Sequence, residues 1–285
     1  MKPASPLVST DWLAEHLEAP DVRIVDASWY LPQAERDAKA EYRAAHIPGA
    51  IFFDIDDLSD EKSTLPHMLA PGPKFASRMR KLGLGDGHLI VAYDSAGIYS
   101  APRAWWMLRA MGHEDVVVLD GGLPKWRREG RPLDDLVPMP STRHFTPRPN
   151  HAIQRDFAQM LALQKQGHEQ IVDARSANRF AGREAEPRAG VRPGHMPKSR
   201  NIPYTELTAE DGTLKSREAL RALFAARDID LAKPSVTTCG SGITAAIEML
   251  ALTIAGSDKL ALYDGSWAEW GARHEAPVES DGATT

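Results

Sequence analysis

A single cysteine stands where a short apolar run gives way to helix-forming residues. Val236-Thr237-Thr238 leads into Cys239-Gly240-Ser241-Gly242-Ile243-Thr244. Two glycines let such a loop curl with its N–H groups turned inward, and the N-terminus of the helix adds partial positive charge. We therefore expect an anion cradle with Cys239 at its mouth, reacting as a thiolate. Without this context, a lone cysteine is more often a small buried hydrophobe.

The loop lacks the arginine that phosphate chemistry would need. Protein phosphatases use a similar cradle, in which a cysteine is followed by five residues and then by an arginine. In this chain the sixth residue beyond Cys239 is Ala245, so a phosphate dianion would have no bidentate partner. Phosphatase and arsenate reductase chemistry are therefore disfavoured, and the alternative is a loop that stabilises a cysteine persulfide.

Strands and helices alternate along the chain, which predicts parallel sheets covered on both faces. A helix is expected over residues 101–111 with Ser100 as its N-cap, and another over residues 244–255 that stops at Gly256. Sites form at the carboxyl ends of such strands, and the cysteine loop occupies that position. Short β-rich runs occur at residues 23–26, 89–93, 116–119, 171–173, 236–238 and 259–262.

The second half of the chain repeats the first in order and spacing. The offsets between matching segments are 147, 149, 145 and 144 residues, which predicts two copies of one fold. We expect domains at 1–131 and 153–285, joined by a proline-containing linker at 132–152. The matching segments are Ile24-Val25-Asp26-Ala27 with Ile171-Val172-Asp173-Ala174, His46-Ile47-Pro48 with His195-Met196-Pro197, Asp94-Ser95-Ala96-Gly97-Ile98 with Cys239-Gly240-Ser241-Gly242-Ile243, and Asp120-Gly121 with Asp264-Gly265.

The duplication and the cysteine loop resemble the rhodanese-like sulfurtransferases, over essentially the whole chain. The loop is most similar to the branch that uses 3-mercaptopyruvate, although position 243 is valine in most of that branch and Ile243 here. Thiosulfate-using members carry arginine and lysine after the cysteine, where this chain has Gly240 and Ser241. The resemblance implies an α/β protein of two tandem rhodanese-like domains, each a parallel sheet flanked by helices. It also implies a catalytically inactive first copy, in keeping with Asp94 at the place of Cys239.

The activity that the resemblance implies is sulfur transfer from 3-mercaptopyruvate through a Cys239 persulfide, with release of pyruvate and no cofactor. Gly240, Gly242, Ile243 and Thr244 would contribute to the substrate and persulfide cradle. The acceptor would be a small thiol, a thioredoxin-like dithiol or cyanide. Two alternatives stay open, namely a thiosulfate sulfurtransferase and a non-catalytic module that carries sulfur for a partner protein.

A proton relay is also implied by the resemblance. Asp56 and His67 match the family's segment between the domains, and with Ser241 they would form a Ser–His–Asp relay. In such a relay the carboxylate orients the imidazole and the imidazole poises the hydroxyl. From the residues alone, His67 would be a surface loop residue and Asp56 a helix cap.

Two arginines match the family's substrate-binding positions. Arg179 and Arg188 could clamp the carboxylate and keto group of an α-keto acid, because guanidinium binds carboxylate in a bidentate way. The alternative is a solvated charged loop, which is the environment that we expect for the neighbouring Arg183, Glu184, Glu186 and Arg192. The histidines show no metal-ligand spacing, and one cysteine makes a structural zinc site improbable.

Composition limits the remaining possibilities. With 34 basic and 39 acidic residues, the net charge of −5 disfavours a nucleic-acid groove. A single cysteine excludes an intramolecular disulfide and fits a reducing compartment. The N-terminal residues lack a signal-peptide pattern, and no apolar run approaches the ~20 residues that span a bilayer. We therefore expect a cytoplasmic enzyme without membrane or nucleic-acid partners.

Overall fold

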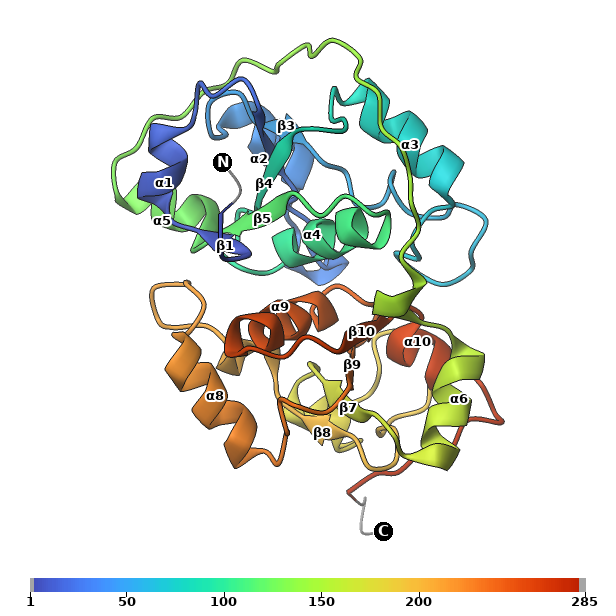
Figure 1. Ribbon diagram of the computed structural model, residues 1–285. Coiled ribbons are helices and arrows are strands. Elements are labelled where there is room, and N and C mark those ends of the chain that lie inside the picture. Colours follow the sequence, from blue (N-terminus) through green and yellow to red (C-terminus); the bar gives the residue numbers. More distant parts are fainter. Residues whose placement is uncertain (1–2, 282–285) are drawn as a thin grey trace. The chain divides into compact units, whose positions relative to one another are not determined.

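The computed structural model describes residues 3–281, which form two α/β units (Figure 1). Each unit contains a five-stranded parallel sheet, and the strand orders are β1-β5-β4-β2-β3 and β6-β10-β9-β7-β8. These two orders correspond strand for strand, so the predicted duplication of an α/β fold is confirmed. Each unit also includes a short segment from the other half of the chain, because residues 208–214 belong to the first unit and residues 62–68 to the second.

The first unit places its longest strands at the centre of the sheet, where both faces are covered. Its strands are β1 (Leu7–Val8), β2 (Val22–Asp26), β3 (Ile51–Phe52), β4 (Leu89–Tyr93) and β5 (Val116–Leu119). Its α-helices are α1 (Thr10–Glu15), α2 (Ala38–Ala44), α3 (Gly72–Lys81), α4 (Ala101–Ala110) and α5 (Gly122–Arg128), and Pro32–Ala34 form a 3-10 turn.

The second unit repeats this order with β9 at the centre of its sheet. Its strands are β6 (Gln154–Arg155), β7 (Gln170–Asp173), β8 (Arg200–Asn201), β9 (Ser235–Thr238) and β10 (Leu260–Tyr263). Its α-helices are α6 (Phe157–Gln166), α7 (Ala177–Phe180), α8 (Arg217–Ala226), α9 (Ala245–Ala255) and α10 (Ser266–Trp270), and 3-10 turns cover His151–Ile153 (η2) and Tyr204–Glu206 (η3).

The same packing recurs in both units. A fully buried tryptophan from the last helix of each repeat, Trp126 on α5 and Trp270 on α10, fills one face of its sheet. Alternate residues of the central strands supply the other side of each cluster, as expected for strands whose two faces are both covered. The histidines of the His-X-Pro motifs are structural, since His46 stacks on Tyr42 at 4.3 Å and His195 on Phe180 at 3.9 Å between ring centroids.

Most predicted elements agree with the structure to within one or two residues, and Ser100 is the N-cap residue of α4 as predicted, although its side chain does not cap the helix. The Ser100 side chain makes no capping hydrogen bond. Its Oγ instead accepts the backbone N–H of Trp29 at 3.0 Å. The N–H groups at the start of α4 are bound by Asp94, which leaves the serine hydroxyl available for this tertiary contact.

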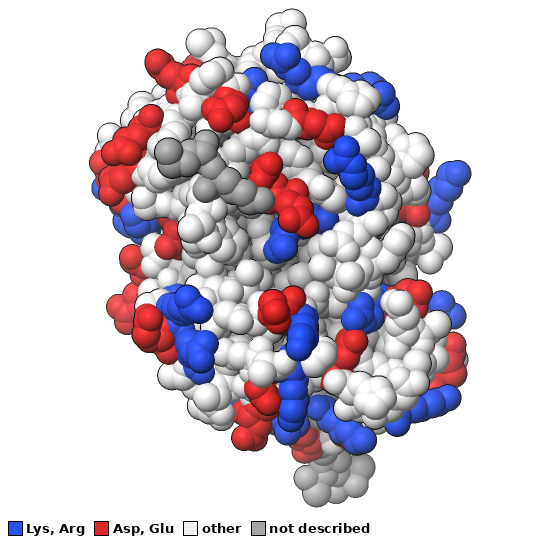
Figure 2. Space-filling model, in the orientation of Figure 1, with Lys and Arg blue, Asp and Glu red and all other residues white. Residues whose placement is uncertain are grey.

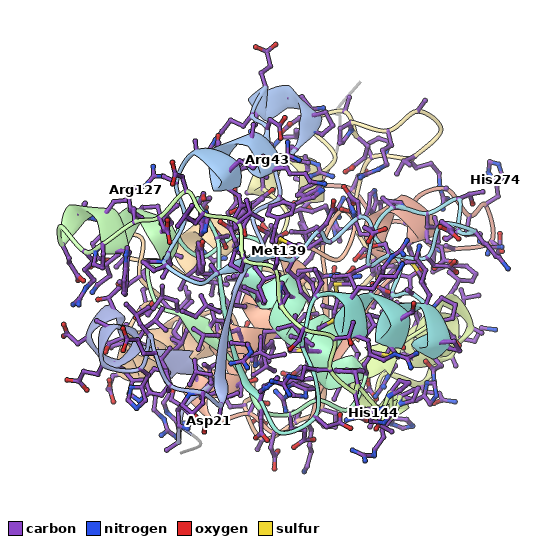
Figure 3. The ribbon with its side chains drawn as sticks, turned by 90° about the horizontal axis from the view of Figure 1, so that it is seen from above. Asp21, Arg43, Arg127, Met139, His144 and His274 are labelled. Atoms are coloured by element: carbon purple, nitrogen blue, oxygen red, sulfur yellow. The ribbon has the colours of Figure 1, made fainter. Side chains whose placement is uncertain are left out.

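The segment predicted as a linker packs against the first unit. The N–H of Asp86 donates to His144 O at 2.9 Å, and the N–H of Arg148 donates to Met111 O at 2.8 Å. The N-terminal part is held as well, because Asp134 and His46 exchange backbone hydrogen bonds at 2.8 and 2.9 Å, whereas Met139 is 97% exposed (Figure 3). The segment is therefore held at both ends and solvated near its middle.

The surface carries both signs of charge. On the face shown in Figure 2, basic and acidic side chains are interspersed without a broad field of one sign. This distribution offers no basic groove on that face. Among residues 3–281, no helix has both the length and the apolar character required to cross a membrane.

Candidate active site

Cys239 follows directly on β9, and the start of α10 holds its backbone. The Cys239 side chain is 2% exposed. The N–H of Trp267 donates to Cys239 O, and the N–H of Ala268 donates to Gly240 O, both at 2.9 Å. Cys239 in turn donates its N–H to Ser266 Oγ at 3.3 Å. These hydrogen bonds fix the backbone of the loop against the start of α10.

The loop turns N–H groups toward the cysteine. Gly242 has a φ of +83°, which favours glycine, and its N–H donates to Cys239 Sγ at 3.1 Å. Among the described residues, the N–H groups of Thr244 and Ala245 at the start of α9 donate to no protein acceptor. Unsatisfied N–H groups at a helix N-terminus form an anion-binding site. The predicted cradle is thus present in the backbone.

The first repeat shows what such a cradle binds. Asp94 Oδ2 accepts the N–H groups of Tyr99, Ser100 and Ala101 at 2.8 to 2.9 Å, and its Oδ1 accepts the N–H of Ala96 at 2.9 Å. With the offset of 145 residues, two of these donors correspond to Thr244 and Ala245. The first loop is therefore filled by its own carboxylate, whereas the second retains donors for an external anion.

Arg179 lies directly against the cysteine loop. A Cβ atom added to Gly240 would be 3.1 Å from Arg179 Nη2, so a side chain at this position would crowd the guanidinium. Glycine at position 240 therefore allows this close approach without displacing the guanidinium. The Arg179 Nη2 donates to Glu186 Oε2 at 2.5 Å, and its buried Nε has no hydrogen-bond partner among the described residues. That Nε–H is thus an unsatisfied donor beside the loop.

A buried chain of ion pairs holds Arg179 in place. Glu186 also accepts from Arg175 Nη1 at 2.8 Å, and Arg175 donates to both carboxylate oxygens of Asp173 at the end of β7. The Arg175 guanidinium lies 4.2 Å from the ring centroid of Trp267. Burial lowers the pKa of Arg175, but the charges of Asp173 and Glu186 outweigh it, so that the pKa is raised overall. Arg175 is thus a permanent cation that connects the sheet to the site.

Arg188 completes a cationic pair beside the sulfur. Burial lowers the pKa of Arg188, the neighbouring charge of Arg179 lowers it further, and the charge of Cys239 acts in the opposite direction. The two guanidinium groups and the cysteine therefore lie within electrostatic range of one another. Among the described residues Arg188 forms neither a hydrogen bond nor an ion pair. Its donors are open to a carboxylate.

Two charges expected to be solvated have structural roles instead. The Glu186 side chain is only 3% exposed, because it bridges Arg175 and Arg179. Arg192 donates to the carbonyl groups of Gly271, Arg273 and Ala276, at 2.6 to 3.0 Å. Neither role has a local sequence signal, because the partners come from distant segments. The role of Arg175 likewise has no strong sequence signal, and only its position two residues after Asp173, at the end of β7, indicates it.

The three residues of the implied relay are distributed between the two units. Asp56 lies in the first unit, and its Oδ2 accepts the indole N–H of Trp29 at 3.0 Å. His67 lies in the second unit with a φ of +59°, as does Ser241, which is 7% exposed. The Ser241 hydroxyl makes no hydrogen bond to a described residue. The relay therefore remains a prediction.

Comparison with known proteins identifies the family to which this fold belongs. The model of the rhodanese-like domain matches residues 9–129 and again residues 156–273. The chain belongs to the rhodanese family. It is 46% identical to a 3-mercaptopyruvate sulfurtransferase of Escherichia coli K12, over 95% of this chain and 97% of that protein. It is also 41% identical to a thiosulfate sulfurtransferase of Bos taurus, over 96% of this chain and 94% of that protein.

A solved structure supports the same relationship within the rhodanese family. The crystal structure of SseA from Escherichia coli, a 3-mercaptopyruvate sulfotransferase, matches with a TM-score of 0.85 and 41% identity. The match covers 93% of this chain and 100% of the SseA chain. The sequence-based assignment to this family is thus confirmed, and the relatives include users of both sulfur donors.

Proposed function

We propose that this chain is a 3-mercaptopyruvate sulfurtransferase. The observation that carries the proposal is the set of open donors around Cys239. Arg188, the Nε–H of Arg179 and the N–H groups that begin α9 all lack protein acceptors among the described residues. An α-keto acid presents a carboxylate and a keto oxygen, which are the acceptors that two guanidinium groups bind best.

The reaction proceeds in two halves. The Cys239 thiolate attacks the thiol sulfur of 3-mercaptopyruvate, the carbon–sulfur bond breaks, and its electron pair leaves as the enolate of pyruvate. Arg179 and Arg188 stabilise the negative charge that develops on the keto oxygen. A proton then converts the enolate into pyruvate, and we assign its delivery to Ser241 with His67 and Asp56. The Cys239 persulfide is held by the N–H groups of the loop.

The second half regenerates the thiolate. A thiol, a thioredoxin-like dithiol or cyanide attacks the outer sulfur, the sulfur–sulfur bond breaks, and Cys239 leaves with the electron pair. No cofactor takes part in either half. We assign the catalysis to the second repeat, since the cradle of the first is occupied by Asp94 and a carboxylate cannot carry sulfane sulfur.

A thiosulfate sulfurtransferase is the second candidate, favoured by the bovine relative. The loop speaks against it, because Gly240 and Ser241 bring no positive charge to a dianion. A non-catalytic sulfur carrier is the third candidate. It is disfavoured by the open guanidinium groups, which a carrier without a small-molecule donor does not require.

The test is a comparison of two donors on one preparation. Pyruvate release from 3-mercaptopyruvate with a thiol acceptor should greatly exceed thiocyanate formation from thiosulfate and cyanide. Cys239→Ser should abolish both activities and keep the fold, since serine replaces the sulfur by oxygen. A preference for thiosulfate, or turnover by the serine variant, would overturn the proposal. Intact mass should show a persulfide that a simple thiol discharges, whereas a persulfide that only a protein partner discharges indicates the carrier.

A further inference from the structure

A buried acid on the helix behind the cysteine has no part in the proposed reaction. Glu248 lies in the first turn of α9, and its side chain is 0% exposed. Neither of its carboxyl oxygens has a hydrogen-bond partner among the described residues. An unpaired carboxylate in a protein interior is strongly disfavoured, so such a group retains its proton instead. Glu248 is therefore an acid whose charge depends closely on its neighbours.

The helix places this acid and the sulfur in the same electrostatic environment. The N-terminus of α9 carries partial positive charge, which favours a negative charge within its first turn. A negative charge on Cys239 and a negative charge on Glu248 would both be stabilised by this same helix N-terminus. Burial raises the pKa of Glu248 well above its usual range, and the charges of Asp173 and Cys239 raise it further. A negative charge on the sulfur thus disfavours ionisation of Glu248, and a negative charge on Glu248 disfavours a negative charge on the sulfur.

Among the described residues no cation pairs with Glu248, whereas Arg179 and Arg188 act on the sulfur and favour its negative charge over that of the acid. The two charges that act on Glu248 are those of Asp173 and Cys239, and the cation next to Asp173, Arg175, is already bound to Asp173 and Glu186. The helix packs against α8, β9, β10 and η3, whose ionisable groups are engaged elsewhere or lie near its other end. On α8, Arg217 and Arg221 approach Gly256 and Ala255 at the far end of α9, and Glu218 is exposed. On η3, Glu206 pairs with Arg227 and Tyr204 is partly buried. Tyr263 of β10 donates to Glu269, and β9 has no ionisable side chain.

The first repeat has the opposite arrangement at the same position. The register that places Asp94 on Cys239 also places Arg103 of α4 on Glu248, at the same offset of 145 residues. Arg103 is also 0% exposed. The loop that carries a carboxylate therefore lies before a helix with a buried cation. The loop that carries the cysteine lies before a helix with a buried acid.

We propose that Cys239 and Glu248 share one negative charge, so that Glu248 holds a proton while the sulfur is a thiolate. The exchange between the two forms is balanced, because a thiol with a carboxylate becomes a thiolate with a carboxylic acid. Glu248 is a positioning residue in this scheme, since it acts on the substrate only through the charge of Cys239. The inference rests on the proposed function in taking the thiolate as the reactive form.

Alkylation of the only cysteine reports this charge directly. The rate of Cys239 carbamidomethylation by iodoacetamide is measured by intact mass as a function of pH. For the wild-type chain the proposal predicts that the rate rises in two steps at least about one pH unit apart, because two groups that share one charge titrate as a pair. Glu248→Gln removes the acid with little change in shape and should leave a single step.

Two further variants keep the test decisive. Glu248→Leu also removes the acid but brings no polar group, so it stays informative if the buried amide of glutamine prevents folding. Glu206→Gln is the matched control and should retain both steps, since Glu206 is partly exposed and paired with Arg227. A single step in the wild-type chain, or two steps in every folded Glu248 variant, would overturn the proposal. The assay needs no sulfur donor, so two-step alkylation without pyruvate release would support this inference and overturn the proposed function alone.

Discussion

The two arginines beside Cys239 differ in how firmly the protein holds them. Arg179 is fixed by Glu186, which is in turn fixed by Arg175, so its position is set before a ligand arrives. Arg188 has no such partner among the described residues. A ligand that binds Arg188 must therefore order the side chain as it binds, while Arg179 is preorganised. In the proposed reaction Arg179 would therefore orient the substrate, and Arg188 would add binding energy and help to stabilise the developing charge.

Arg188→Ala should consequently impair binding without harming the fold. We expect the KM for 3-mercaptopyruvate to rise by about 10-fold to 100-fold, since a hydrogen bond between charged groups contributes about 1.5–3 kcal/mol. The urea midpoint should change little, because no hydrogen bond or ion pair to a described residue is lost. Steady-state kinetics and urea unfolding measure the two quantities. Arg183→Ala, which removes a charge from an exposed part of the same loop, is the control. An unchanged KM would show that Arg188 does not bind substrate.

The sequence indicates only part of this site. The cysteine loop is predictable because its chemistry is local, with a strand, two glycines and a helix start in one short run. Arg179 and Arg188 follow from family resemblance rather than from any physical pattern. The Glu186 bridge is not predictable in either way, because a carboxylate in a charged loop has the same local signature whether it is solvated or buried.

At the scale of the elements, the C-terminal part of the predicted linker packs closely on the backbone of the first unit. A Cβ atom added to Gly112 would lie 2.4 Å from Arg148 O, so the two backbones touch. Gly85 similarly allows His144 to approach. The two glycines lie just after the C-terminal ends of α4 and α3, and the segment packs directly on them. Proline content indicates an extended segment, but not that it is packed.

Gly112→Ala should therefore destabilise the protein by more than left-handed strain alone explains. Gly112 and Gly87 have φ values of +83° and +86°, but nothing lies within 4 Å of a Cβ added at Gly87. Gly87→Ala thus measures the strain, of order 1 kcal/mol. Gly112→Ala should add a steric term of about 1–3 kcal/mol, as overpacking does. Thermal melts of both variants give the comparison. Equal losses of stability would mean that the backbone at Arg148 moves away from the new methyl group without a measurable cost.

At the scale of the whole molecule, the two copies compensate a buried aspartate in different ways. Asp26 and Asp173 occupy the same position at the ends of β2 and β7, and both are almost fully buried. Arg175 neutralises Asp173 in the second unit. In the first unit the corresponding residue is Ser28, whose N–H and Oγ–H donate to Asp26 Oδ1 at 2.9 and 2.5 Å. Hydrogen bonds without a cation leave the charge of Asp26 only partly offset.

The repeat predicts two such copies, but not which segments each contains. Residues 208–214 join the first unit, where the N–H of Leu214 donates to Asp120 Oδ1 at 2.8 Å and Arg128 donates to Asp211 O at 2.5 Å. These are long-range contacts between short polar stretches. Hydrophobic periodicity predicts helices and strands, and it contains no information about where a polar turn docks.

The uncompensated carboxyl makes stability depend on pH. Burial raises the pKa of Asp26 to about 6, and the hydrogen bonds from Ser28 only partly oppose this rise. In the unfolded chain the pKa is about 3.9. Between these values the folded chain binds more protons than the unfolded chain, so the free energy of unfolding falls as pH rises. The loss is complete above the folded pKa and amounts to about 3 kcal/mol, at 1.36 kcal/mol per pKa unit.

Asp26→Asn should remove this dependence, because asparagine can accept the same hydrogen bonds without a charge. The free energy of unfolding of the variant, relative to the wild-type chain, should increase by about 3 kcal/mol between pH values below 4 and above 6. Urea titrations across this range provide the difference. Asp135→Asn, at an exposed position, should show no such trend. A constant difference between Asp26→Asn and the wild-type chain at every pH would mean that the folded protein accommodates the Asp26 charge as well as water does.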